Sequence, residues 1–166
     1  MPDIILKINN SNDKIPLSDS ICCYLVACRL PADKLAVLQN SGKMVLATPD
    51  SYTSDCAGMV AEVDSAKPVK VQIRPLREKL GAKKALGVVI NPTRHEAMLA
   101  SETEPEFVAF RYTQENATKA AEVIRWYNEL FLIQSAVDLS SGLVDVKGLD
   151  VDFVIINSSD YDDFSC

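Results

Sequence analysis

Short apolar segments recur along the whole of this 166-residue chain, and they constrain its fold more than any other feature. Each is rich in Val, Ile, Leu or aromatic residues and is bounded by polar turns, which is the pattern of a β-strand. The sequence therefore predicts about eight strands. The strands are expected among nine candidate segments: 3–8, 21–28, 43–48, 58–64, 69–74, 86–90, 106–112, 143–146 and 149–156.

Two of these segments carry a more detailed prediction. Residues 21–28 are apolar throughout, which favours a central strand buried on both faces, with a helix capped by Ser18 as the alternative. Residues 69–74 alternate between apolar and polar side chains, which predicts a half-exposed strand with Lys70, Gln72 and Arg74 on its outer face.

Three segments have helical signals. Pro31 can begin a helix and Gly42 can end one. Thr93 and Glu96 have the spacing of a capping box, which predicts a short helix that ends near Ser101. A longer helix is expected from about residue 115 to 137, where apolar side chains recur every three or four positions.

The order of these elements favours an α+β domain with a mainly antiparallel sheet, one long helix and two short helices. Strands do not alternate regularly with helices, so a doubly wound parallel sheet is the weaker interpretation. A β-sandwich or jelly roll with inserted helices is the alternative. Residues 1–166 form one domain in this interpretation, with a short acidic tail at 158–166.

The composition is that of a globular domain, with 48% hydrophobic and 24% charged residues. No run approaches the roughly 20 apolar residues that span a bilayer, and a signal peptide is not evident, so a cytoplasmic protein without membrane association is expected. The five cysteines are an odd number, which favours free structural thiols. The cysteine at 22 is expected to face away from the one at 23.

Few catalytic or metal-binding patterns are present. His95 is the only histidine, and no zinc, calcium or phosphate-loop motif surrounds it. No cofactor and no metal are therefore expected. His95 near a helix N-terminus could still act as a general base, which keeps a small enzyme as one interpretation.

Uneven charge is the most informative functional feature. Residues 67–95 include eight basic residues and one acidic residue, Glu78, whereas the chain as a whole carries a net charge of −6. Such a segment can bind anions, or it can be a solvated edge. The basic residues are Lys67, Lys70, Arg74, Arg77, Lys79, Lys83, Lys84 and Arg94.

The C-terminal end has the opposite charge. Aspartates and aromatic side chains alternate there, so the tail can dock through apolar anchors, with the basic segment of a neighbouring subunit as its expected partner. Charge alone contributes only about 0–1 kcal/mol per exposed ion pair. The docking residues are Asp160, Tyr161, Asp162, Asp163 and Phe164.

These surfaces favour a non-enzymatic interaction or assembly protein that binds itself or another protein. A coat-type structural subunit is one instance. The alternatives are a binder of nucleic acid or of a phosphorylated ligand through residues 67–95, with weak affinity for nucleic acid, and a small enzyme that uses His95.

Overall fold

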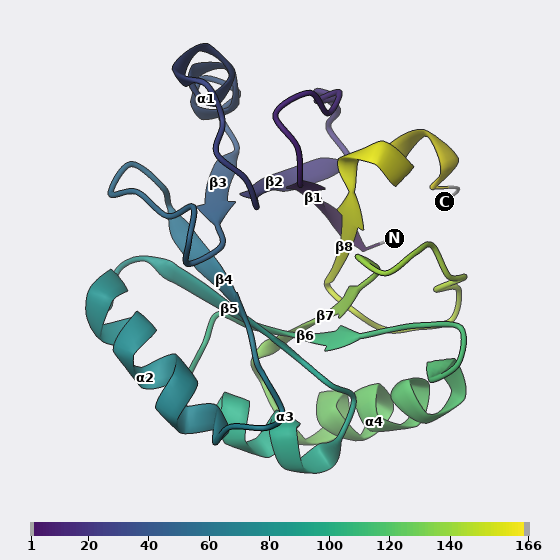
Figure 1. Ribbon diagram of the computed structural model, residues 1–166. Coiled ribbons are helices and arrows are strands. Elements are labelled where there is room, and N and C mark those ends of the chain that lie inside the picture. The colour runs from purple at the N-terminus through teal and green to yellow at the C-terminus, as the bar shows by residue number, and fades with distance from the viewer. Residues whose placement is uncertain (1, 165–166) are drawn as a thin grey trace.

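The computed structural model describes residues 2–164, and it is a closed barrel of eight parallel strands in chain order (Figure 1). Every strand pairs in parallel with its sequence neighbours, and β8 pairs with β1 to close the ring. The strands are β1 (Asp3–Ile8), β2 (Ile21–Val26), β3 (Met44–Ala47), β4 (Gly58–Glu62), β5 (Ala85–Ile90), β6 (Phe107–Arg111), β7 (Gln134–Asp138) and β8 (Phe153–Asn157).

Helices fill only some of the connections between these strands. Four connections contain an α-helix, and a short 3-10 helix follows β8. Three connections, at 9–20, 48–57 and 139–152, contain neither helix nor strand. The helices are α1 (Ala32–Gln39), α2 (Val69–Leu80), α3 (Arg94–Ser101), α4 (Ala117–Leu130) and η1 (Ser158–Asp163).

The core has an inner and an outer part. Inside the barrel, apolar side chains from all eight strands pack together, with Phe107 and Phe153 at 5.6 Å between ring centroids. Outside, the opposite faces of the strands pack against the helices and loops. Figure 1 shows α2, α3 and α4 around one side of the ring and η1 on the opposite side, with the 139–152 loop between α4 and η1.

The expected antiparallel sheet and the alternative sandwich or jelly roll are both wrong. The strand count was close, but the connectivity is parallel throughout. Regular alternation of strands and helices is hidden because three crossovers are irregular loops. A parallel crossover needs roughly a dozen residues but does not need a helix.

The predicted strand at 69–74 is wrong, because these residues begin helix α2. Val69, Ile73 and Leu80 are buried at helical spacing. Val71, which strand alternation would place with Val69 and Ile73, is 67% exposed. Six residues are too few to distinguish the helical period of 3.6 residues from the strand period of two.

The C-terminal third also differs from the prediction. Helix α4 ends at Leu130, so the predicted helix is too long, and the residues at its predicted end belong to β7. Residues 143–146 are not a strand, and the last strand is β8 rather than 149–156. The apolar residues of β7 follow α4 so closely that they resemble a continuation of its helical spacing.

Two predicted helix starts are confirmed. Helix α1 begins directly after Pro31, and α3 begins after Thr93, whose side chain accepts a hydrogen bond from the Glu96 backbone N–H at 3.2 Å. Glu96 does not complete the capping box on Thr93. Its carboxylate instead accepts a hydrogen bond from the backbone N–H of Asn91 at 3.1 Å.

Within residues 2–164, no helix is long and apolar enough to cross a membrane.

Candidate functional site

Charged side chains converge on the barrel mouth, which is the end of the barrel where the strands finish. Lys7, Glu62, Arg111 and Asp138 come from β1, β4, β6 and β7. Each lies two residues after a side chain of the inner core, so strand alternation places it on the inner face. Four strands thus bring two cations and two anions to one opening.

A hydrogen-bonded chain links two of these groups. The Lys7 ammonium donates to the Ser140 hydroxyl at 3.3 Å, and that hydroxyl donates to the Asp138 carboxylate. The Ser140 backbone N–H reaches the same carboxylate oxygen at 3.1 Å. Asn157, at the end of β8, donates to the Ser140 backbone oxygen at 2.9 Å and fixes the loop that carries the serine.

Asp138 is the most enclosed charged group of the mouth, with 7% of its surface exposed. Burial raises the pKa of its carboxyl above the usual value, and the nearby Glu62 acts in the same direction. The hydrogen bonds from Ser140 and the charge of Lys7 oppose this rise without cancelling it. A carboxylate with a raised pKa is a better base near neutral pH.

A second hydrogen-bond network holds the Arg111 guanidinium beside the ends of β4 and β5. Its guanidinium donates to the Asn91 side-chain oxygen at 3.0 Å and to the Val63 backbone oxygen at 2.9 Å. Glu62 lies 3.9 Å from the same guanidinium. These contacts orient Arg111. Lys7 has fewer contacts, since Ser140 is the only hydrogen-bond partner of its ammonium group among residues 2–164.

The floor of the mouth is apolar. Leu25, Val60, Val89 and Ile155 lie below the charged layer, and Thr48 and Ser140 line its rim. The enclosed cavity is about 10 Å³, which is room for about one water molecule. A larger ligand would therefore sit above the charged layer, between the loops, and not inside the barrel.

Titration of Asp138 predicts a pH-dependent stability difference. Its folded-state pKa is raised, so the folded protein binds the proton more tightly than the unfolded chain does. The stability of the wild type should therefore fall as pH rises from about 3.8 through the raised value.

Urea unfolding of wild type and Asp138→Asn between pH 4 and 8 should show the variant gaining stability relative to wild type as pH rises. The gain should reach at most about 1.4 kcal/mol for each pH unit over which Asp138 titrates. A difference that does not change with pH contradicts this.

The predicted basic segment lies mostly on and around α2, and many of its side chains contact other parts of the same chain. Lys70 pairs with Glu102, and Arg77 contacts Glu106 at 2.8 Å. The Lys84 ammonium donates a hydrogen bond to the Tyr52 hydroxyl, and the ammonium groups of Lys79 and Lys84 both lie over the Tyr52 ring. Arg94 lies over the Trp126 ring, 5.2 Å from its centroid.

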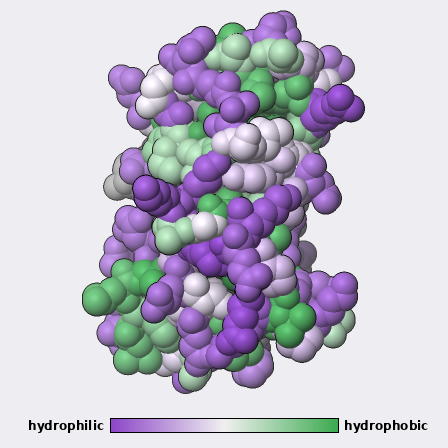
Figure 2. Space-filling model, turned by 90° about the vertical axis from the view of Figure 1, so that its left-hand side faces the viewer, coloured by the Kyte–Doolittle hydropathy of each residue, from purple (hydrophilic) through white to green (hydrophobic). Residues whose placement is uncertain are grey.

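Only part of that segment remains for a partner. Lys67, Arg74 and Lys83 are exposed, and no side chain among residues 2–164 pairs with them. Figure 2 shows the side of the molecule where α1 and α2 lie, and hydrophilic residues cover most of it with smaller apolar patches between them. Self-association through this surface stays a prediction, which sizing at two salt concentrations can test. Anion binding there also stays a prediction, which the salt dependence of nucleic-acid binding can test.

The predicted docking tail packs against its own barrel. Tyr161 and Phe164 are half-buried against the outer core, and the Tyr161 hydroxyl lies 3.3 Å from that of Ser20. Asp160 lies 3.4 Å from Asn157, while Asp162 and Asp163 are exposed. Residues 165–166 lie outside the described chain. In Figure 1 this tail and α2 are on opposite sides of the barrel, so they do not meet within one chain.

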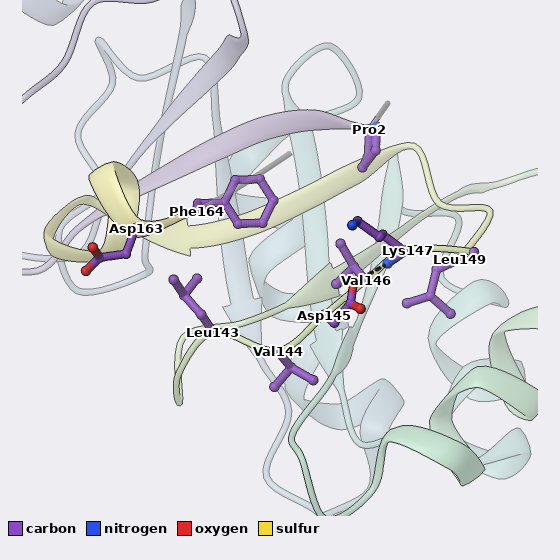
Figure 3. A pocket seen from close by; sticks show the side chains of 10 residues that line it. Pro2, Leu143, Val144, Asp145, Val146, Lys147, Leu149, Asp163 and Phe164 are labelled. Atoms are coloured by element: carbon purple, nitrogen blue, oxygen red, sulfur yellow. Dashed lines mark hydrogen bonds between the residues drawn. The ribbon is translucent and has the colours of Figure 1, made fainter.

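A groove of about 520 Å³ borders this tail (Figure 3). The Phe164 ring faces the same space as Leu143 and Val146 from the 139–152 loop. Pro2 also lines it, so the groove is formed by the two ends of the described chain and one loop. Asp145, Lys147 and Asp163 add charge to a lining that is otherwise mostly apolar.

Packing of the tail predicts a stability effect. Removing residues 160–166 should lower the free energy of unfolding by about 2 kcal/mol, because the Tyr161 and Phe164 rings lose their apolar contacts. Urea unfolding measures this change. The double variant Asp162→Asn with Asp163→Asn should leave stability within about 0.5 kcal/mol of wild type, since both side chains are exposed. A truncated chain as stable as the wild type would show that the rings contribute nothing.

His95 is exposed in the first turn of α3, and it does not line the cavity at the barrel mouth. The residues that sequence reasoning missed are those of the mouth. A signal existed, because Lys7, Glu62, Arg111 and Asp138 are charged residues at the ends of otherwise apolar segments. Within residues 2–164, no three His, Cys, Asp or Glu side chains gather as a metal site.

No protein-family model matches this sequence, and the search of curated proteins gives no match.

Proposed function

We propose that the protein is an enzyme that binds a small anionic molecule at the barrel mouth and transfers a proton with Asp138. The observation that carries this proposal is the convergence of Lys7, Glu62, Arg111 and Asp138 from four strands above a closed apolar floor. Asp138 is buried, and Lys7 and Arg111 are half-buried. Charge is costly to bury, so this cluster suggests a use in binding or chemistry.

The architecture supports the choice of this end. Barrels of eight parallel strands with α-helical crossovers carry their active sites at the C-terminal ends of the strands. They frequently hold a phosphate group at the loops after the seventh and eighth strands. Here Ser140 and Asn157 occupy that position, and Lys7 supplies a positive charge beside them. This arrangement favours a phosphorylated or carboxylated ligand.

Each side chain has a chemical role in this proposal. A lysine has three N–H donors, and Lys7 uses one for Ser140, so two can bind an anionic oxygen of the ligand. The second carboxylate oxygen of Asp138 has no hydrogen-bond partner among residues 2–164, so it can accept a proton. Arg111 and Glu62 orient the far side of the ligand.

Ligand binding is the first test. Inorganic phosphate, pyrophosphate and a short 2-oxo acid would be titrated against the wild type by calorimetry. We expect at least one of them to bind, and Lys7→Met to weaken that binding about 10-fold to 100-fold through loss of a charge-assisted hydrogen bond. Arg74→Met removes the same charge from the exposed face of α2 and should leave binding unchanged.

Catalysis is the second test. For any bound carbonyl compound, exchange of its α-protons for deuterium would be followed by nuclear magnetic resonance. Asp138→Asn should lower the exchange rate by about 10² to 10⁴ while the dissociation constant changes little. The proposal is wrong if Lys7→Met and Arg74→Met have equal affinities, or if Asp138→Asn exchanges protons at the wild-type rate.

A further inference from the structure

Two neighbouring cysteines point the same way at the other end of the barrel. Strand β2 has an irregular register against β1, where Ile4 pairs with Ile21 but Ile5 pairs with Cys23. Cys22 is the extra residue of this bulge. As a result Cys22 and Cys23 both pack against the inner core, although neighbours on a regular strand face opposite sides. The expectation that they face apart is wrong.

The bulge brings the two sulfur atoms to 3.7 Å from each other. Both side chains are half-buried, so solvent and small ions can reach them. The shared hydrogen bond lowers the pKa of the Cys22 thiol and raises that of Cys23. The Lys43 charge also lowers the pKa of Cys22, whereas the neighbouring Asp3 raises it.

A third sulfur-bearing side chain comes from the neighbouring strand. Met44 is the register partner of Cys23 on β3, and it lies two residues before the inner-core residue Leu46, so alternation places it on the same inner face. Met44 is the first residue of β3 and is 44% exposed, so its side chain is open to solvent. Three sulfur-bearing side chains therefore share one end of the barrel and one face of two adjacent strands.

The sulfur spacing suits a bridging metal ion better than a disulfide. A disulfide would need the sulfurs to approach to about 2.05 Å, and adjacent Cα atoms, about 3.8 Å apart, are closer than the usual disulfide range. A metal about 2.3 Å from each sulfur would span the observed separation with an S–metal–S angle of about 107°. A metal ion could therefore bind both sulfurs with little movement of the side chains.

We infer that Cys22, Cys23 and Met44 form a binding site for one Cu(I) ion at the N-terminal end of the barrel. Thiolate and thioether sulfur are soft ligands, which favour Cu(I) and zinc over hard metal ions. A structural zinc site has four ligands, usually Cys and His, and residues 2–164 gather no third such ligand here. On binding, both thiols release their protons to solvent, and Lys43, whose ammonium binds the Ser18 and Ile21 backbone oxygens, balances the added negative charge.

Copper titration tests this inference independently of the barrel mouth. The reduced full-length protein would be titrated anaerobically with Cu(I) in competition with bicinchoninate, which reports free copper by its colour. We expect one tightly held copper per chain. Cys22→Ser and Cys23→Ser should each weaken it at least 100-fold, and Met44→Leu should weaken it less. Circular dichroism would verify that each variant is folded.

Cys28→Ser is the matched control, because Cys28 is also half-buried but follows the opposite end of β2. It should retain the copper. Zinc, in competition with a chromophoric chelator, should bind more weakly than copper by orders of magnitude. The inference is overturned if wild type and Cys22→Ser retain copper equally, if Cys28→Ser loses it as well, or if zinc is held as tightly.

Discussion

Replacing Gly58 by alanine is expected to destabilise the protein by about 3 kcal/mol. Gly58 begins β4, where it pairs with Leu46 on one side and Ala85 on the other. A Cβ atom at this position would lie 2.2 Å from the backbone oxygen of Ala85. That oxygen belongs to the neighbouring strand, so the new methyl group can fit only if β4 and β5 move apart.

Gly148→Ala is the comparison that isolates this clash. Gly148 has a φ of +84° and open space around its Cα, so alanine adds backbone strain but no collision. It should cost about 1–2 kcal/mol. Urea unfolding would measure both variants. A Gly58→Ala protein that is no less stable than Gly148→Ala would show that the barrel tolerates a wider gap between β4 and β5.

The positions of most strands could be predicted from the sequence, but their pairing could not. Residues 3–8, 58–62 and 86–90 are apolar segments that any strand pattern reveals. Parallel pairing leaves no local mark, because it depends on the path of the connection and not on the strand itself. Three connections without helices removed the alternation of strands and helices that would have indicated it.

The candidate site was hidden for the same reason. Lys7 and Asp138 are 131 positions apart in the sequence, and only barrel closure brings β1 and β7 to either side of β8. A charged residue that ends an apolar strand can face solvent on an ordinary sheet. It becomes informative once all strands run the same way, because their ends then share one opening.

Charge blocks along the sequence were a less direct guide to function. Arg77 and Arg94 belong to the basic segment, yet each contacts a side chain of the same chain. Tyr161 and Phe164 cover the outside of the barrel on the side that lacks a long helix. Local charge therefore reflects, in part, how a small barrel covers its strands with few helices.

Tyr127 should be the most important single side chain among the helices. It is fully buried on α4, with its ring 5.3 Å from that of Phe110 on β6 and stacked on Phe131 at 4.8 Å. Its hydroxyl accepts a hydrogen bond from Ser101 on α3 at 3.3 Å. One residue thus joins two helices and a strand. Tyr127→Ala is expected to lower the free energy of unfolding by about 3–5 kcal/mol.

Tyr127→Phe separates the ring from the hydroxyl. It keeps both aromatic contacts and leaves only the buried Ser101 hydroxyl without its partner, so a loss of about 1 kcal/mol is expected. Urea unfolding followed by circular dichroism gives both values. If the phenylalanine variant loses as much as the alanine variant, the hydrogen bond to α3 holds the helices on the barrel. If both lose less than about 1 kcal/mol, α4 adds little to the stability of the closed ring, and the strands hold the fold by themselves.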